Sequence, residues 1–446
     1  MILLLKVVQV VLALSILIIV HEFGHFMFSK MFGARVEKFY LFFDANGIRL
    51  FSTKHSSFVK KHFPKLAESE TDYGIGWLPF GGYCKITGMV DESMDTDFTK
   101  EEAKPYEFRS KKAWQRLLIM AGGVLNNFIL AILLYVAILA IWGQSYVSTR
   151  DNEVYVNELA YDMGFRSGDR ILALDDYVPD NIYLLQAEIA RRGAFKVSVL
   201  RGGDTVNVYI DQSRMEEILN TPGMFDVAIP FVVDSVPEGS LNEAAGLEAG
   251  DRIVSVDSSS TPYLQDARSV LADASGMVVP ITVLRDADSL TMDVQVDTAG
   301  RIGVYTRMPS VQSKKYGFLE AIPAGLKLTW TTIAGYVSDL KLVATPSTGA
   351  YKSVGSFVAI GQVFPNKWDW YQFINILAML SIMLGVMNLL PIPALDGGHI
   401  LFTLYEMVTG RKPSDKFLIA MQWLGMILIF MLMFLAMGND ILRLIR

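Results

Sequence analysis

The sequence has very little cysteine and comparatively little charge. Cys84 is the single cysteine among 446 residues, which excludes a fold held together by disulfides. Charged residues make up 19% of the chain, below the roughly 25% of an average soluble domain, whereas hydrophobic residues reach 52%. Positive charge is not in excess either, because 40 Lys and Arg stand against 46 Asp and Glu, and this argues against a nucleic-acid partner. The low charge and the high hydrophobic content favour a membrane protein, and the length of 446 residues favours several domains.

Four hydrophobic segments are long enough to cross a bilayer, since a spanning helix needs about 20 mostly apolar residues. They are Ile2–Val20, Leu117–Trp142, Phe373–Leu390 and Phe417–Met437. The first segment lacks the basic start and the small-x-small cleavage site of a secretory signal peptide, so we expect it to be retained as a helix. With their flanking residues, the four membrane helices are assigned to 1–30, 117–142, 371–409 and 410–446.

Basic residues beside these segments predict their orientation. They gather in the loop 31–116 and in the loop between the last two segments, at Lys30, Arg35, Lys38, Arg109, Lys111, Lys112, Arg116, Arg411, Lys412 and Lys416. The positive-inside rule places both loops in the cytoplasm. The region 143–310 is then exported, and it has 26 Asp and Glu against 13 Lys and Arg. Both chain ends are expected outside as well.

The exported region contains an internal duplication. Gly164–Ile171 recurs as Gly246–Ile253, at an offset of 82 residues, and both copies contain Gly-Asp-Arg-Ile. Two copies at so long a period predict tandem α+β domains, at 143–225 and 226–308. The shared motif resembles that of PDZ domains, which bind extended peptides by strand addition. The alternative is a pair of structural β-rich spacers without a ligand.

Between the exported region and the third hydrophobic segment lies an amphipathic linker, 309–370. Its segment Phe318–Leu342 includes Trp330 and Tyr336. We expect this segment to lie in the membrane interface and to couple the exported domains to the membrane core.

The first hydrophobic segment ends in the motif His-Glu-Phe-Gly-His. On a helix, His21 and His25 lie one turn apart on one face, where both imidazoles can reach one zinc ion. Glu22 stands beside them and can take a proton from water at the metal. The motif alone is weak, since a helix end with two surface histidines would match it. Ionisable groups at membrane depth are costly and usually functional, and this favours the metal site.

A catalytic zinc usually has three protein ligands and one open position. Glu37 and Asp44 are possible third ligands on spacing alone. Asp396 is a better candidate, because it follows the third hydrophobic segment after two prolines that break the helix, Pro391 and Pro393. Irregular backbone at membrane depth is tolerated only inside protein or at a wet cavity, so Asp396 should face a site. The alternative is a helix-capping aspartate.

The two metal motifs together resemble those of the site-2 protease family of intramembrane zinc metalloproteases. Within it, the chain is most similar to the bacterial RseP-type regulator-of-sigma-factor proteases with tandem PDZ domains. Further stretches carry the resemblance, namely the basic lead-in Tyr106–Arg116, the GxxxN motif Gly123–Asn127 and the membrane re-entrant β-loop Trp77–Lys85. The likeness covers essentially the whole chain.

The resemblance implies a set of site residues. Zinc is expected on His21, His25 and Asp396, with Glu22 as general base. Asn388 is expected to help bind the substrate backbone. The re-entrant loop, with Gly81, Gly82 and Tyr83, is expected to present a strand edge to the substrate.

Several positions stand apart from the family pattern. Val124 occupies a place where the family often has proline. Residues 45–72 look like a Lys-rich extension of the cytoplasmic loop, whose His55 and His62 are expected to be surface residues. His399 is expected to be structural or to support the site, and Cys84 to be a reduced thiol without a catalytic role.

The sequence therefore predicts a polytopic α-helical membrane protein. It has four transmembrane helices, a membrane-associated β-loop region on the cytoplasmic side and two exported α+β PDZ-like domains. The resemblance implies regulated intramembrane proteolysis in the bacterial inner membrane, with the active site towards the cytoplasm and the exported domains gating entry. Its substrates would be single-span proteins, such as a trimmed anti-sigma factor or a remnant signal peptide. A catalytically silent PDZ scaffold and a metal transporter are the alternatives.

Overall fold

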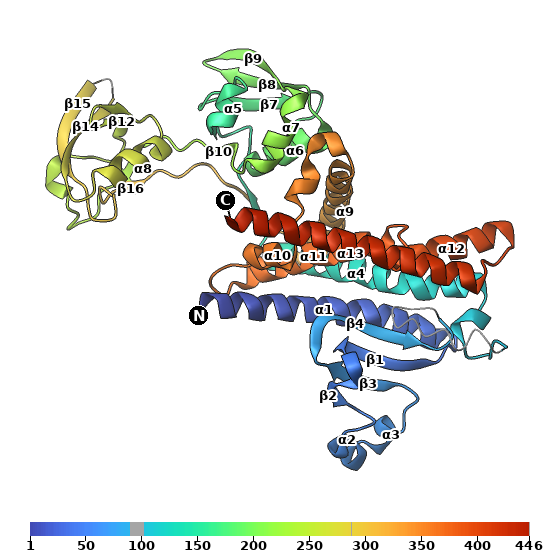
Figure 1. Ribbon diagram of the computed structural model, residues 1–446. Helices are drawn as coiled ribbons and strands as arrows, with labels where there is room; N and C mark the ends of the chain where they lie inside the picture. The colour runs from blue at the N-terminus through green and yellow to red at the C-terminus, as the bar shows by residue number, and fades with distance from the viewer. Residues whose placement is uncertain (90–101, 287, 446) are drawn as a thin grey trace. The chain divides into compact units, whose positions relative to one another are not determined.

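The computed structural model describes residues 1–89, 102–286 and 288–445. Part of the predicted cytoplasmic loop, 90–101, lies outside them. The chain divides into two units, which are described separately (Figure 1). The membrane unit consists of Met1–Gly143, Lys315–Lys341 and Lys352–Arg446, and the lobed unit consists of Gln144–Lys314 and Leu342–Tyr351.

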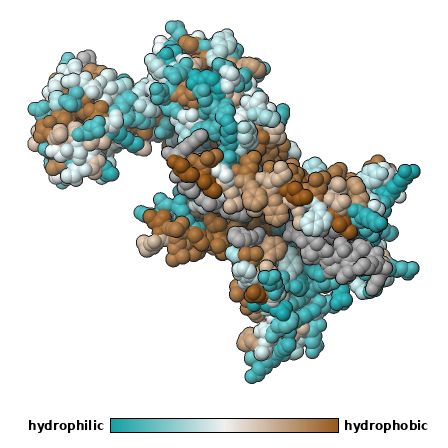
Figure 2. All heavy atoms as spheres, in the orientation of Figure 1, coloured by the Kyte–Doolittle hydropathy of each residue, from teal (hydrophilic) through white to brown (hydrophobic). Residues whose placement is uncertain are grey.

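Four long apolar helices dominate the membrane unit. They are α1 (Ile2–Met31), α4 (Ala113–Ile141), α11 (Trp370–Leu389) and α13 (Asp415–Ile445). Each contains 18 residues with a mean hydropathy of 1.8 to 2.8, of which only 11% to 50% are buried within the protein. Figure 2 shows the resulting apolar surface in brown along these helices. The prediction of four helices able to cross a membrane is thereby confirmed.

Glycines allow α1 and α4 to approach at backbone distance. A Cβ atom added to Gly24 would lie 2.1 Å from the carbonyl oxygen of Gly122, and one added to Gly122 would lie 2.6 Å from that of Gly24. Such small residues let membrane helices pack backbone to backbone. The contact fixes the end of α1 that carries both histidines against α4.

The chain between α11 and α12 is not helical. α11 ends at Leu389, two residues before Pro391, and α12 (Asp396–Thr409) begins after a turn in which Ala394 has a φ of 77°. Proline removes a backbone donor and cannot continue a helix, which accounts for the break. Asp396 thus becomes the first residue of a new helix. Two further helices of the unit are α9 (Phe318–Val343) and α10 (Phe357–Val363).

A four-stranded sheet lies beside α1 (Figure 1). Its strands are β1 (Val36–Phe43), β2 (Arg49–Ser52), β3 (Asp72–Gly76) and β4 (Leu78–Ile86), in the order β2-β3-β1-β4. The extension between β2 and β3 forms two short helices, α2 (Ser57–His62) and α3 (Pro64–Ala67). β4 is an edge strand, because it pairs with β1 on one side and with no other described strand.

The predicted amphipathic segment forms α9. Leu328, Ile333 and Tyr336 of this helix pack on a cluster of buried side chains from α4 and α11. Gly325 lies so close to α4 that an added Cβ would be 2.5 Å from a methyl group of Val136. The helix is therefore packed against the membrane helices along one face, and its place in the interface stays a prediction.

The lobed unit contains two hydrophobic cores in succession. The first lobe contains β6 (Val154–Val156), α5 (Glu158–Asp162), β7 (Arg170–Leu174), α6 (Leu185–Arg192), β8 (Lys196–Arg201), β9 (Asp204–Tyr209), α7 (Met215–Asn220) and β10 (Phe225–Val227). The second contains β11 (Val233–Ser235), β12 (Arg252–Val256), β13 (Ser259–Ser260), α8 (Leu264–Asp273), β14 (Val278–Arg285), β15 (Asp288–Gln295) and β16 (Tyr305–Thr306). At the two ends of the chain segment, β5 (Gln144–Tyr146) pairs with β17 (Gln312–Lys314).

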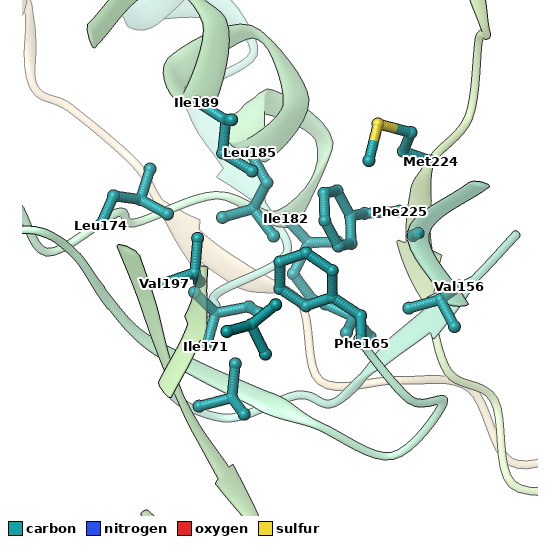
Figure 3. Packing of buried hydrophobic residues seen from close by; sticks show 14 of the residues in the cluster. Val156, Phe165, Ile171, Leu174, Ile182, Leu185, Ile189, Val197, Met224 and Phe225 are labelled. Atoms are coloured by element: carbon teal, nitrogen blue, oxygen red, sulfur yellow. The ribbon is translucent and has the colours of Figure 1, made fainter. Parts of the chain in front are cut away.

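The two lobes share one local plan. Each has a sheet of consecutive antiparallel strands, β7-β8-β9 in the first and β12-β14-β15 in the second, with a helix after the first of these strands. Figure 3 shows the core of the first lobe, where Phe165 meets Phe225 edge to face at 5.0 Å. The two lobes therefore share this local arrangement, while the duplication and the assignment of the lobes as PDZ domains stay predictions.

The duplicated sequence motif builds the same polar contact in both lobes. Asp169 receives two hydrogen bonds from Arg201, both of 2.7 Å, and Asp251 receives two from Arg285, of 2.7 and 2.8 Å. Both carboxylates are fully buried. Bidentate arginine–carboxylate pairs of this kind are geometrically specific. They explain why an aspartate stands at the same place in each copy.

The second of these pairs predicts a pH-dependent stability. Hydrogen bonds from Arg285 hold the pKa of Asp251 below its ordinary value, against the opposing effect of burial. The stabilisation is complete above the pKa of an unfolded aspartate, about 3.9, and is lost as the pH falls through the lower folded value. At neutral pH, Asp251→Asn should raise hydrogen exchange in β12 and β14 by on the order of tenfold, the loss expected for one charge-assisted hydrogen bond.

Hydrogen–deuterium exchange of the full chain, read by mass spectrometry, measures this effect. Asp273→Asn is the matched control, because Asp273 is an exposed carboxylate at the end of α8. Equal protection of β12 and β14 in Asp251→Asn and the unchanged protein would show that the pair does not stabilise the lobe.

Candidate metal centre and active site

His21 and His25 turn the same ring nitrogen towards a common point. Both side chains are buried on α1, and their Nε2 atoms lie 3.3 Å apart. Nδ1 of His25 lies 2.9 Å from the carbonyl oxygen of Ile119 on α4, to which it can donate only as N–H. A proton on Nδ1 leaves the lone pair of a neutral imidazole on Nε2. His25 is therefore held in the form that binds a metal.

Asp396 completes a triangle with the two imidazoles. Its Oδ2 atom lies 3.3 Å from Nε2 of His21 and 3.3 Å from Nε2 of His25. This oxygen is buried and finds no hydrogen-bond donor among the described residues. A buried carboxylate oxygen without a donor, facing the Nε2 atoms of two imidazoles, is what a cation would compensate. The N-cap residue of α12 is Leu395, without a side-chain cap, so Asp396 does not cap its own helix.

The dimensions of this triangle fit zinc. Three ligand atoms at tetrahedral angles and bonds of about 2.0–2.1 Å are separated by about 3.3 Å. Two imidazoles and one carboxylate also form a typical donor set for catalytic zinc. Among the described residues, His21, His25 and Asp396 are the one group of His, Cys, Asp and Glu side chains close enough to hold a metal ion.

Two residues of α4 lie against the imidazole rings of His21 and His25. A Cβ atom added to Gly123 would lie 2.5 Å from Nε2 of His25 and 2.6 Å from Cε1 of His21, so only glycine leaves room for the rings. One turn later, Nδ2 of Asn127 lies 3.1 Å from Nδ1 of His21, while Oδ1 of this buried amide has no hydrogen-bond donor among the described residues. Exchanging the nitrogen and oxygen of the amide lets Oδ1 accept from Nδ1–H of His21 and leaves Nε2 free to bind metal, as supporting contacts of metal-bound histidines usually do.

Sequence reasoning singled out Gly123 and Asn127 only as parts of a family motif. A polar residue in an apolar span is a hint of function. The sequence does not indicate, however, that Asn127 would contact His21. Asn127 is fully buried, and its own backbone oxygen accepts a hydrogen bond from Ser381 of α11.

A cavity of about 640 Å³ opens in front of the triangle. Besides the three candidate ligands it is lined by other residues singled out in the sequence, namely Glu22, Asp44, Gly81, Gly82, Tyr83, Cys84, Asn388 and His399. Glu22 accepts a hydrogen bond from the backbone N–H of Cys84 on β4. The candidate base is therefore held between α1 and the sheet edge, at the wall of the cavity.

The remaining candidate ligands have other partners. Asp44 accepts hydrogen bonds from Lys38, at 2.8 Å, and from the hydroxyl of Tyr83, at 2.7 Å. Burial raises the pKa of Asp44, but these hydrogen bonds outweigh it, so that the pKa lies below its ordinary value. Burial and the hydrogen bond to Asp44 raise the pKa of Tyr83. Glu37 accepts a hydrogen bond from Thr87 at 3.1 Å.

The histidines of the extension lie away from this centre. His55 is exposed and contacts Ser52 at 3.0 Å, and His62 is exposed and contacts the carbonyl oxygen of Phe58 at 3.0 Å. Neither belongs to the group that could hold a metal.

Comparison with known proteins extends these observations to the whole chain. The chain is 28% identical to a candidate zinc metalloprotease of Xylella fastidiosa (strain Temecula1), with 97% of each protein covered. It is 28% identical to the protease RseP of Yersinia pestis and 27% identical to the regulator of sigma-E protease RseP of Escherichia coli (strain K12), covering 97% of this chain and 98% of each relative. These similarities confirm the expected resemblance. Because the model of peptidase family M50 matches residues 9–432, the chain belongs to this family.

Proposed function

We propose that the protein is a zinc metalloprotease that hydrolyses a peptide bond in or beside the membrane helix of its substrates. The observation that carries the proposal is the triangle of His21, His25 and Asp396, with a carboxylate and an open strand edge at the same cavity. Membership of a peptidase family and a zinc metalloprotease among the relatives support the same reaction.

The metal would be held by Nε2 of both histidines and Oδ2 of Asp396. Zinc in this position supplies Lewis-acid polarisation of the scissile carbonyl and of the attacking water. The hydrogen bond from His25 to Ile119 keeps its ring oriented, and Asn127 does the same for His21. These contacts fix the tautomers before substrate arrives, which lowers the cost of assembling the site.

Glu22 is the general base in this proposal. It neighbours His21 in the chain, lines the cavity and is oriented by the N–H of Cys84. Its carboxylate takes a proton from the attacking water and then delivers a proton to the leaving amine. A single carboxylate can perform both steps, because the proton that it gains in the first is available for the second.

The open edge of β4 is suited to hold the substrate extended. The N–H of Cys84 points to Glu22 and hence away from β1, and alternate residues of a strand share an edge, so Gly82 also exposes its backbone there. A helix conceals its peptide bonds in hydrogen bonds, so a transmembrane substrate must unwind before cleavage. Strand addition replaces those hydrogen bonds with new ones. Asn388 of α11 also lines the cavity and can bind the same backbone.

Single-span membrane proteins are the proposed substrates, such as a trimmed anti-sigma factor or a remnant signal peptide. Several relatives are named as regulators of sigma-E, and this supports the first class. The proposed location is the bacterial inner membrane, with the catalytic cavity towards the cytoplasm and the lobed unit exported. Lys30 and Arg116, at the ends of α1 and α4 that adjoin the cavity, support this orientation.

The first test concerns the third ligand. Asp396→Ala should lower zinc occupancy strongly, because two histidines alone form a weak site. Asp44→Ala should leave zinc in place, since Asp44 is bound to Lys38 and Tyr83. Zinc content of the purified full-length proteins, measured by inductively coupled plasma mass spectrometry, decides between them. Loss of zinc from Asp44→Ala but not from Asp396→Ala would reverse the assignment.

The alternative is a catalytically silent scaffold. A scaffold would tolerate loss of the base or of a ligand, yet Glu22 and all three ligand candidates are present in one cavity. A metal transporter would need more than one ligand cluster along a path, and the described residues provide one.

The exported lobes are proposed to exclude substrates with bulky exported domains. They are inserted between α4 and α9, and β5 and β17 join the two ends of the insertion. Exclusion by size needs no favourable contact and discriminates through a steric penalty.

Deletion of 150–305 with a flexible linker leaves this two-stranded ladder in place and tests the steric filter. The variant should keep its zinc and should cleave substrates with untrimmed exported domains, which the full-length protein should spare. Cleavage of a paired long and trimmed substrate measures the difference. If the full-length enzyme cuts both equally, the lobes are not a filter.

A further inference from the structure

The extension between β2 and β3 exposes apolar and basic side chains together. We call α2 and α3 with the residue between them, 57–67, the α2–α3 tip. Its large apolar residues are exposed, Phe58 by 64%, Phe63 by 56% and Leu66 by 40%. The basic residues of the tip are Lys60, Lys61 and Lys65, all exposed, and the tip contains no Asp or Glu. Exposed aromatic rings interleaved with lysines are typical of surfaces that meet a membrane.

The tip is held firmly by the sheet. At its base, the buried carboxylate of Asp72 accepts hydrogen bonds from the side chains of Ser52 and Thr53 and from the backbone N–H of Lys54. Within the tip, the rings of Phe58 and His62 stack at 4.5 Å. The exposed side chains are therefore presented by an ordered structure rather than by a free loop.

The sheet that carries the tip packs against the apolar helix α1. β4 lies against the middle of α1, where Ile18 would touch a Cβ added to Gly82, and the ring of Phe26 packs on Phe39 at 5.4 Å. Nearer the end of α1, Lys30 lies 3.8 Å from Glu70, which follows the tip. The sheet thus runs along the second half of an apolar helix, with the tip on its side away from α1 (Figure 1).

The position and the composition of the α2–α3 tip both favour the lipid bilayer as its partner. A surface beside the basic end of a membrane-crossing helix lies where lipid headgroups begin. The three lysines of the tip outnumber the two exposed glutamates that follow it, Glu68 and Glu70, and complement anionic headgroups. Aromatic rings are favoured at the boundary of the hydrocarbon. Figure 2 shows both apolar and polar surface in this part of the unit.

We propose that the α2–α3 tip inserts Phe58, Phe63 and Leu66 into the bilayer interface and sets its three lysines against anionic lipid headgroups. The sheet is then anchored on both sides, by α1 next to β4 and by lipid at the tip. This anchoring concerns the bilayer and not the substrate or the metal, so its test does not depend on proteolysis.

Spin labels in the full-length protein test the insertion. Phe63→Cys is labelled in a Cys84→Ser background and reconstituted in nanodiscs of phosphatidylcholine mixed with phosphatidylglycerol. Collisions with oxygen, which partitions into lipid, should be frequent, and collisions with a water-soluble nickel chelate should be rare. Phe434→Cys on α13 gives the reference for lipid, and Glu238→Cys in the second lobe gives the reference for water; both positions are exposed.

A label at position 63 that behaves like the one at 238 overturns the proposal, and so does shielding from both reagents, since that indicates a protein partner or a second copy.

The charge component is tested by Lys60→Gln, Lys61→Gln and Lys65→Gln combined. With all three lysines present, phosphatidylglycerol should move the label at position 63 deeper than phosphatidylcholine alone does. The triple variant should lose this shift, and an undiminished shift would remove the lysines from the proposed role.

Discussion

Glu22→Gln should retain its zinc and lose proteolysis by about 10²–10⁴-fold, the usual contribution of a general base. The substitution keeps the size of the side chain and an oxygen that can accept the hydrogen bond from Cys84. It leaves His21, His25 and Asp396 unchanged, so the metal should remain. What disappears is the group that takes a proton from water. Zinc content and cleavage of a reconstituted single-span substrate measure the two effects separately.

A matched carboxylate provides the control for this prediction. Glu37 lies on β1 of the same unit, where it is bound to Thr87 and is not among the residues that line the cavity. Glu37→Gln should therefore cleave at the rate of the unchanged enzyme. Substantial residual proteolysis by Glu22→Gln would remove Glu22 from its role as base. The inactive variant should also retain uncleaved partners in the membrane, and their identification by mass spectrometry would name the natural substrates.

The membrane helices and the metal triangle could be predicted from the sequence because their signals are local or specific. Hydropathy over about 20 residues marks a span without knowledge of its neighbours. His21 and His25 are one helical turn apart, so their joint position follows from helix geometry alone. Asp396 is far away in the chain, and only the broken helix after Pro391 and the family motif pointed to it.

The support of the site could not be predicted in the same way. Gly123 and Asn127 matter because α4 packs against α1 at a particular rotation, fixed by backbone contact at Gly24 and Gly122. The hydrophobic periodicity of neither helix indicates which other helix it packs against. Likewise, the repeated Gly-Asp-Arg-Ile indicated a duplication. The pairing of its second aspartate, Asp251, with Arg285 could not be predicted, because Arg285 lies on a later strand. Contacts between distant elements are decided by packing, which the sequence pattern records only indirectly.

Gly123→Ala should abolish stable zinc binding while preserving the helices. The new methyl carbon would lie 2.5 Å from Nε2 of His25 and 2.6 Å from the ring of His21, well inside van der Waals contact. Either both imidazoles move or α4 is displaced, and each outcome breaks the ligand triangle. We expect zinc affinity to fall by at least about 100-fold, the upper end of what loss of a supporting contact costs, because two ligands are disturbed at once.

The control for this change is Gly438→Ala. Gly438 also lies in a long apolar helix, α13, but an added Cβ would meet no atom within 4 Å. Both substitutions favour helix formation, since alanine exceeds glycine in helix propensity by about 1 kcal/mol. Circular dichroism should therefore show full helical content for both variants, whereas metal analysis should show zinc only in Gly438→Ala. Zinc at the unchanged level in a helical Gly123→Ala protein would mean that the metal does not lie between the two histidines where α4 approaches them, and the proposed centre would have to be abandoned.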